Sequence, residues 1–126
     1  MAKSQLRSKR KSSGGRYIDY RKKKLYELGR DATLTKLGKL SKRVLRVRAG
    51  SKKEITLSAE DVNVFDSKTK KHKKVKIKNV LENPANRHYV RRNILTKGTI
   101  VDTELGKVRI TSRPGQEGTL SGVLVK

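Results

Sequence analysis

The residues that could carry covalent or metal chemistry are few and scattered. The chain has two histidines, His72 and His88, and no cysteine. Thiolate zinc sites, disulfides and cysteine nucleophiles are therefore excluded, and an all-histidine metal site is not expected. Neither histidine lies in a serine or cysteine nucleophile pattern, and the carboxylates show no paired spacing typical of acid and base catalysis. We expect neither an enzyme nor a cofactor.

The abundant chemistry is that of cations. Lysine and arginine number 34 against 11 aspartate and glutamate, which gives a formal net charge of +23 in 126 residues. Like charges at this density oppose compaction unless a polyanion neutralises them, so RNA, DNA or an anionic membrane surface is the candidate partner. No apolar stretch reaches the ~18 to 20 residues that span a bilayer, and no export signal is recognisable at the start of the chain. A soluble nucleic-acid-binding protein is the favoured hypothesis.

The first cationic cluster lies near the N-terminus. Residues 7–16 mix cations with serines and two adjacent glycines, so the backbone can approach phosphates and arginine can bind them through two parallel hydrogen bonds. A disordered tail or a localisation signal is the alternative. The tetrad at residues 21–24 lies among Tyr17, Tyr20 and Tyr26. These rings could stack on unpaired bases, or alternatively pack against their own protein.

The second cluster occupies residues 68–78, where seven lysines surround His72. We expect it on a hairpin loop and on the outer face of the following strand. An edge strand protected from aggregation by lysine is the alternative, but it explains one or two lysines better than seven. Because lysine lacks the planar fork of arginine, this cluster should bind the nucleic acid backbone with little sequence preference.

The elements that position these cations are mainly strands. Residues 74–78 alternate lysine with Val75 and Ile77, which predicts one core face and one lysine face. Similar short stretches occur at residues 44–48, 53–57, 62–65, 99–101, 108–111 and 123–125. We therefore expect an all-β fold, a small barrel of about six to eight short antiparallel strands with one short helix.

Two local signals interrupt the strands. Asn83 offers an N-cap and Pro84 a first helical residue, which predicts a short helix over residues 85–93. Residues 112–116 read Ser-Arg-Pro-Gly-Gln and predict a tight turn, with Gly115 at a positive φ.

The charge distribution predicts two regions. Residues 1–43 hold 15 Lys and Arg, three acidic residues and few large apolar side chains. This region cannot bury enough apolar surface to offset its ordering entropy, so we expect an extended basic arm that orders only on RNA, with a possible short helix at residues 20–28. Residues 44–126 are expected to form the barrel domain.

Several of these stretches together resemble one family. They are residues 9–15, Lys-Arg-Lys-Ser-Ser-Gly-Gly, residues 22–30, which contain Tyr-Glu-Leu-Gly-Arg, and the turn at residues 112–116, with further similarity over residues 35–38, 46–50, 83–87 and 95–98. Nearly the whole chain is similar to the archaeal and eukaryotic small-subunit ribosomal protein eight-e family. The long insertion that eukaryotic members carry before Ser-Arg-Pro-Gly-Gln is missing, so the chain resembles the short archaeal form.

The resemblance implies a β-barrel body, an extended arm and a structural, non-enzymatic role in the cytoplasmic small ribosomal subunit. The implied partners are small-subunit ribosomal RNA and neighbouring ribosomal proteins, without a membrane, a metal or a small-molecule substrate. A chromatin or generic single-strand binder and an RNA-processing enzyme are the rival hypotheses. Each predicted RNA-binding residue is a lysine or arginine of the arm, the strands and their turns, the helix or the Pro114 turn. They are Arg7, Lys9, Arg10, Lys11, Arg16, Arg21, Lys22, Lys23, Lys24, Arg30, Lys36, Lys39, Lys42, Arg43, Arg46, Arg48, Lys70, Lys71, Lys73, Lys74, Lys76, Arg87, Arg91, Arg92 and Arg113.

Overall fold

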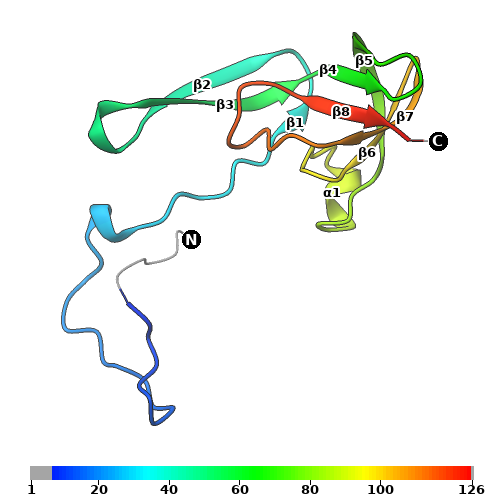
Figure 1. Ribbon diagram of the computed structural model, residues 1–126. Helices are drawn as coiled ribbons and strands as arrows, with labels where there is room; N and C mark the ends of the chain where they lie inside the picture. Colours follow the sequence, from blue (N-terminus) through cyan, green and yellow to red (C-terminus); the bar gives the residue numbers. More distant parts are fainter. Residues whose placement is uncertain (1–6, 126) are drawn as a thin grey trace. The chain divides into compact units, whose positions relative to one another are not determined.

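The computed structural model describes residues 7–125 and shows two compact units that separate between Ala32 and Thr33 (Figure 1). The first unit contains a tight reversal of the chain. Lys11 N donates to Gly15 O over 2.7 Å, and Gly14 N donates to Lys11 O over 3.0 Å. Gly14 has a φ of +84°, which residues with a Cβ rarely adopt, so glycine makes this reversal possible. Where a short helix was possible at residues 20–28, a single 3₁₀ turn, η1 (Leu25–Glu27), is present.

Five strands of the second unit close into a barrel, in the order β4 (Asp61–Asp66), β5 (Lys71–Glu82), β6 (Ile100–Thr103), β7 (Gly106–Ile110) and β8 (Ser121–Leu124). Neighbouring strands are antiparallel except for the closing pair, β4 and β8, which is parallel. The long β5 pairs with β4 through its first half and with β6 through its second half. Its register shifts after Ile77 and Val80 indicate bulges, which bend the strand and help to close the barrel.

The barrel encloses the hydrophobic core. Strand alternation is visible in β5, where Val75 and Ile77 are buried while Lys74, Lys76 and Lys78 are exposed, so the predicted register of this strand is confirmed. The neighbouring strands contribute mainly valines and other small aliphatic residues: Val62, Val64, Val101, Val108 and Ile110, with Leu95 and Leu120 from connecting segments.

Three further strands form a separate sheet in the order β1 (Lys36–Leu37), β3 (Lys52–Ala59) and β2 (Ser41–Arg46), with the 3₁₀ turn η2 (Arg48–Gly50) joining β2 to β3. Thr35 is fully buried just before β1 and donates its hydroxyl to Thr56 O over 2.7 Å. Its own carbonyl accepts from Leu95 N at 2.8 Å. Residues 33–43 therefore belong to the second unit, which starts at Thr33.

The all-β class is confirmed, and α1 (His88–Arg91) is the single α-helix among residues 7–125. About six to eight strands were expected in one barrel; of the eight strands in the described residues, five form the barrel and three form the separate sheet. One barrel pairing is parallel rather than antiparallel, since β8 runs in the same direction as β4, on which it closes the barrel.

The helix is shorter than predicted because Asn83 has other partners. Its buried side chain accepts from Ala85 N at 3.0 Å and from the Thr96 hydroxyl at 3.0 Å, and it donates to Ile94 O over 3.1 Å. These bonds tie the end of β5 to the segment before β6. The helix consequently begins at His88, whose N–H donates to the Asn86 side chain.

The turn at Pro114 forms as predicted, with Gln116 N donating to Arg113 O over 2.8 Å. The positive φ expected at Gly115 is wrong, since Gly115 is not among the positive-φ glycines. A Cβ at Gly115 would instead lie 3.2 Å from both the carbonyl oxygen and the Cβ of Thr33. Glycine is favoured there because another backbone segment approaches closely.

Candidate nucleic-acid interface

The cations of residues 7–16 are all exposed in the first unit: Arg7, Lys9, Arg10, Lys11 and Arg16. They lie on both sides of the chain reversal, in which Gly14 adopts a positive φ. The Arg7 guanidinium lies 4.1 Å from the centre of the Tyr17 ring and the Lys11 ammonium 5.6 Å from it. These cation–π contacts occupy Tyr17 with its own protein, as the alternative for the tyrosines anticipated.

Arg21 differs from its basic neighbours because it is half-buried and paired. It donates from Nη1 to Glu27 Oε2 over 3.1 Å, and its Nη2 also bonds the Glu27 carboxylate. These bonds, and a hydrogen bond to the Tyr20 hydroxyl, raise the pKa of Arg21 above its ordinary value. By contrast, the three lysines that follow are exposed: Lys22, Lys23 and Lys24, as is Arg30.

Glu27 is only 7% exposed, the one buried charged residue among those the structure describes. Its carboxylate accepts from Lys24 N at 3.0 Å and from the Arg21 guanidinium. The hydrogen bond from the Lys24 backbone, followed by that from Arg21, lowers the pKa of Glu27 below its ordinary value. The sequence alone did not single out Glu27 as a functional residue, although it lies within the Tyr-Glu-Leu-Gly-Arg motif.

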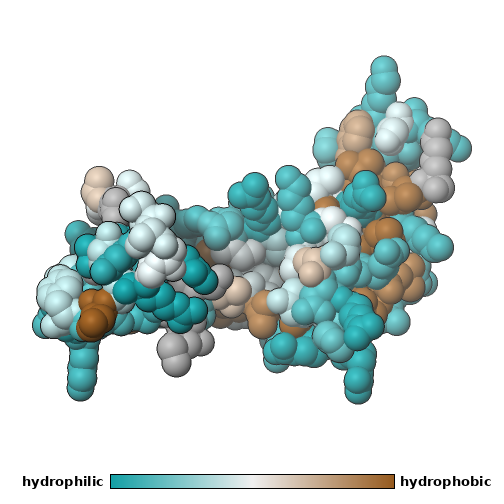
Figure 2. All heavy atoms as spheres, turned by 90° about the horizontal axis from the view of Figure 1, so that it is seen from below, coloured by the Kyte–Doolittle hydropathy of each residue, from teal (hydrophilic) through white to brown (hydrophobic). Residues whose placement is uncertain are grey.

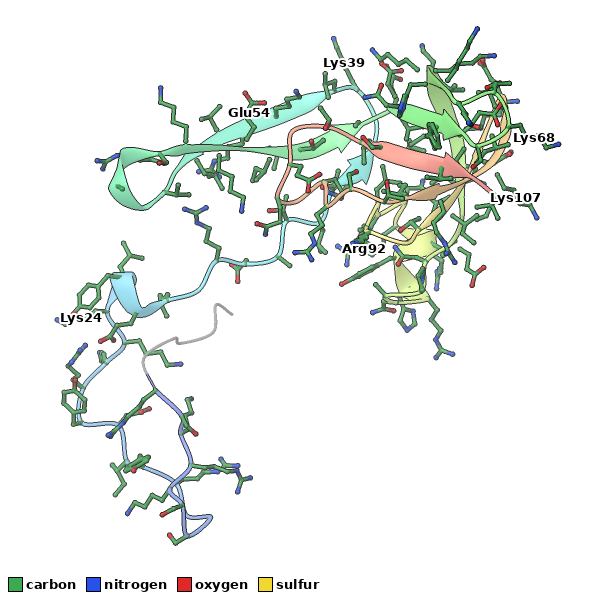
Figure 3. All side chains as sticks on the ribbon, viewed as in Figure 1. Lys24, Lys39, Glu54, Lys68, Arg92 and Lys107 are labelled. Carbon is green, nitrogen blue, oxygen red and sulfur yellow. The ribbon has the colours of Figure 1, made fainter. Side chains whose placement is uncertain are left out.

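The separate sheet carries a second group of cations. The predicted cations described here are all exposed: Lys36, Lys39, Lys42, Arg43 and Arg46. Lys42 Nζ lies 3.6 Å from Glu54 Oε2, a surface ion pair of small energetic weight. Lys39 extends away from the turn between β1 and β2 (Figure 3). The side chain of Arg48 lies outside the described part of the structure.

The barrel presents a third group along β5 and in the turn before it, where Lys70, Lys71, Lys73, Lys74 and Lys76 are all exposed. Lys74 Nζ is 2.9 Å from Asp61 Oδ2, and this hydrogen bond raises the pKa of the ammonium. Lys70 has a φ of +52° in the turn before the strand. His72 packs against Phe65 with ring centroids 4.9 Å apart, so it has a structural role on the outer face.

The helical and turn cations are also exposed: Arg87, Arg91, Arg92 and Arg113. Sequence reasoning left out several exposed cations, among them Lys52 opposite Arg46, and Lys107 and Arg109 in β7. Strand alternation would have placed Lys107 and Arg109 on the outer barrel face, because Val108 and Ile110 point inward. Lys68 and Lys107 extend outward from the barrel in Figure 3.

The predicted cations thus fall into one group on the first unit and several on the second. Hydrophilic residues cover most of the face seen in Figure 2. Within residues 7–125, no three His, Asp or Glu side chains are grouped so that they could hold a metal ion. Nor does that range contain a helix with the length and apolar character needed to cross a bilayer. Such dispersed cations can contact an extended polyanion at many points.

Comparison with known proteins identifies the family. Residues 4–125 match the model of the family described as ribosomal protein S8e. The chain is 53% identical to the small ribosomal subunit protein eS8 of Methanocella arvoryzae, over 98% of both chains. It is 49% identical to that of Methanocorpusculum labreanum, over 97% of this chain and 98% of the relative, and 48% identical to that of Picrophilus torridus, over 96% and 97%. Because both kinds of match extend over nearly all of its length, the chain belongs to the ribosomal protein S8e family.

Proposed function

We propose that this protein is a structural constituent of the cytoplasmic small ribosomal subunit, in which it binds ribosomal RNA through its basic arm and through the cations of the sheet and barrel. Like its relatives, it is a ribosomal protein and not an enzyme. The partners are small-subunit ribosomal RNA and neighbouring ribosomal proteins. The predicted RNA-binding cations of both units are the contact residues of this proposal.

One observation carries the proposal. Even if every one of the 11 carboxylates paired with a different cation, 23 of the 34 lysines and arginines would lack an acidic partner, and the described members of the predicted set are exposed or, for Arg21, half-buried. Such an excess is neutralised well by RNA phosphates, with release of counterions from the RNA. Lysine and arginine contacts to phosphate fix the position of the protein without reading sequence.

The test compares the full-length protein with a variant that lacks residues 1–32. The second unit keeps its core and all its strands, so the variant should still unfold cooperatively. Its affinity for in vitro transcribed small-subunit ribosomal RNA should fall. If the deletion removes on the order of five to eight phosphate contacts, the slope of log K against log[salt] should flatten by about 4 to 7 units.

Duplex DNA of equal charge and a high-salt wash of small subunits complete the test. If the proposal holds, ribosomal RNA should displace the duplex DNA from the protein, and the protein should sediment with the subunits after the wash. Equal binding to DNA would instead favour a generic nucleic acid binder. If the deletion variant bound with the full-length slope and affinity, the arm would have to be removed from the proposed interface.

A further inference from the structure

The 3₁₀ turn η1 holds two large side chains out in solvent. Leu25 is 87% exposed and Tyr26 is 80% exposed, whereas the next residue, Glu27, is only 7% exposed. A buried charge beside exposed apolar groups reverses the usual arrangement. The ring of Tyr26 and the aliphatic side chain of Leu25 are therefore accessible to a binding partner.

The orientation of this turn is fixed by hydrogen bonds on its inner side. The Glu27 carboxylate accepts from Lys24 N at 3.0 Å, so the carboxylate ties the start of the turn to its end. Two nitrogens of Arg21 bond the same carboxylate. Arg21 is in turn held by Tyr20, because its Nε donates to the Tyr20 hydroxyl over 2.9 Å. With Glu27 held inward, the side chains before it in the turn face outward.

The three tyrosines of this unit are not equivalent. Tyr17 has two cations over its ring, and the Arg21 guanidinium lies 5.1 Å from the centre of the Tyr20 ring. For Tyr26, no aromatic or cation contact occurs with any residue from 7 to 125. Its ring is the one whose face is open to a partner.

The surroundings indicate what that partner is. Lys22, Lys23 and Lys24 precede the turn, and all three are exposed; Lys24 is labelled beside η1 in Figure 3. An aromatic ring with cations next to it matches the alternation of base and phosphate in a single strand. A purely apolar protein surface would leave the ammonium groups without counter-charges.

We propose that Tyr26, with Leu25 beside it, stacks on an unpaired base of the RNA, and that the Arg21–Glu27 pair positions it. The proposal rests on the proposed function, since it requires RNA binding by the arm. Tyr26 supplies stacking, while the neighbouring lysines take the phosphates. Arg21 then acts mainly through Glu27.

The first experiment measures binding of full-length variants to in vitro transcribed small-subunit ribosomal RNA over a range of salt concentrations. Stacking on an aromatic residue is worth about 1–3 kcal/mol by alanine substitution, so Tyr26→Ala should weaken binding about 5- to 150-fold. Because stacking releases no counterions, the slope of log K against log[salt] should not change. Lys23→Ala is the matched control, and it should reduce the slope by about 0.7 to 0.9.

Two further substitutions separate stacking from apolar contact. Tyr26→Phe keeps a planar ring and should bind within about twofold of the wild type, whereas Tyr26→Leu should lose nearly as much as Tyr26→Ala. Leu and Phe binding equally well would overturn the proposal in favour of an apolar protein neighbour. Wild-type affinity in the alanine variant would also overturn it. If the wild-type protein itself failed to bind RNA, the proposed function would fail instead.

The positioning role has its own readout. The chain contains no tryptophan, so Tyr26→Trp introduces a single fluorophore. RNA should quench this fluorescence and shield it from acrylamide, whereas heparin, a polyanion without bases, should do neither. Adding Glu27→Gln should reduce the RNA-induced quenching at saturating RNA. Asp31→Asn, which changes the net charge equally at an exposed site, should leave the quenching intact. Unchanged quenching in the Glu27→Gln variant would remove the positioning role.

Discussion

Gly122 in β8 offers the sharpest test of how the barrel closes. A Cβ at this position would lie 2.6 Å from Val108 Cγ1 and 2.9 Å from the carbonyl oxygen of Arg109. Favourable contacts between carbon atoms occur at about 3.5–4.0 Å, so an alanine at Gly122 overlaps its neighbours by about 1 Å. Gly122 also pairs with Val64 of β4 and with Ile110 of β7. The strand cannot move far from one partner without disturbing its pairing to the other.

The expected cost follows from this overlap. Overpacking a well-packed core costs about 1–3 kcal/mol, and the second unit, of the size of a small domain, should have a total stability of about 5–14 kcal/mol. Gly122→Ala should therefore stay folded but melt about 4–24 °C lower, at about 4–8 °C for each kcal/mol. Thermal unfolding followed by circular dichroism measures the shift. Ser121→Ala, next to it in β8, adds no volume and should melt within a few degrees of the wild type.

A second substitution tests the mechanism of the destabilisation. Val108→Ala removes the methyl group that a Cβ at Gly122 would meet first. The double variant should therefore be more stable than the sum of the two single effects predicts, with a coupling energy of about 0.5–3 kcal/mol. An additive double variant, or a Gly122→Ala protein that melts with the wild type, would refute the pairing of β8 between β4 and β7.

Three further predictions concern β5, the Pro114 turn and the hairpin between β4 and β5. Ile77→Asp puts a carboxylate into the core and should unfold the second unit. Lys76→Gln, on the opposite face of β5, should keep the melting temperature of the wild type and weaken RNA binding. If the two variants had the same melting temperature, the register assigned to β5 would be wrong. Gly115→Val should lower stability by about 1 kcal/mol or more in urea unfolding because its side chain meets a backbone oxygen, while the exposed Glu117→Val should not. Asp66 accepts from a backbone N–H and a threonine hydroxyl, and the backbone hydrogen bond is the larger cause that lowers its pKa below 3.8. The ionised Asp66 carboxylate thus stabilises the fold above pH 3.8, and this stabilisation is lost as the pH falls through the lower folded-state pKa. The melting temperatures of Asp66→Asn and the wild type should therefore differ at pH 6 and converge in acid.

The strand faces and turns could be predicted because they depend on neighbours in sequence. Alternation places Val75 and Ile77 on one face of β5 whatever the strand pairs with, and the burial follows. The turn at Pro114 likewise needs only its own residues. The φ of Gly115 could not be predicted, because the requirement for glycine comes from Thr33, which is distant in sequence.

Strand partners could not be predicted for the same reason. Alternation shows that β3 has a strand pattern, but it carries no information on whether β1, β2 or a barrel strand lies beside it. The parallel closure of β8 on β4 joins segments more than fifty residues apart, as the pairing of Val64 with Gly122 illustrates. Thr35 shows the same limit, because it is polar and is bound into the second unit by hydrogen bonds to the distant residues Thr56 and Leu95.

The candidate site was predictable in composition but not in the division of tasks. Within the tetrad at residues 21–24, the sequence gives no reason to separate Arg21 from the three lysines. The fold separates them, because a guanidinium can bond a carboxylate with two nitrogens while a lysine ammonium offers only a point charge. Most donors of Arg21 are engaged with Glu27, the Tyr20 hydroxyl and the Lys22 carbonyl, so its main role is to hold the turn. The lysines carry no such constraint, so they can bind phosphate while the Arg21–Glu27 pair keeps η1 in place.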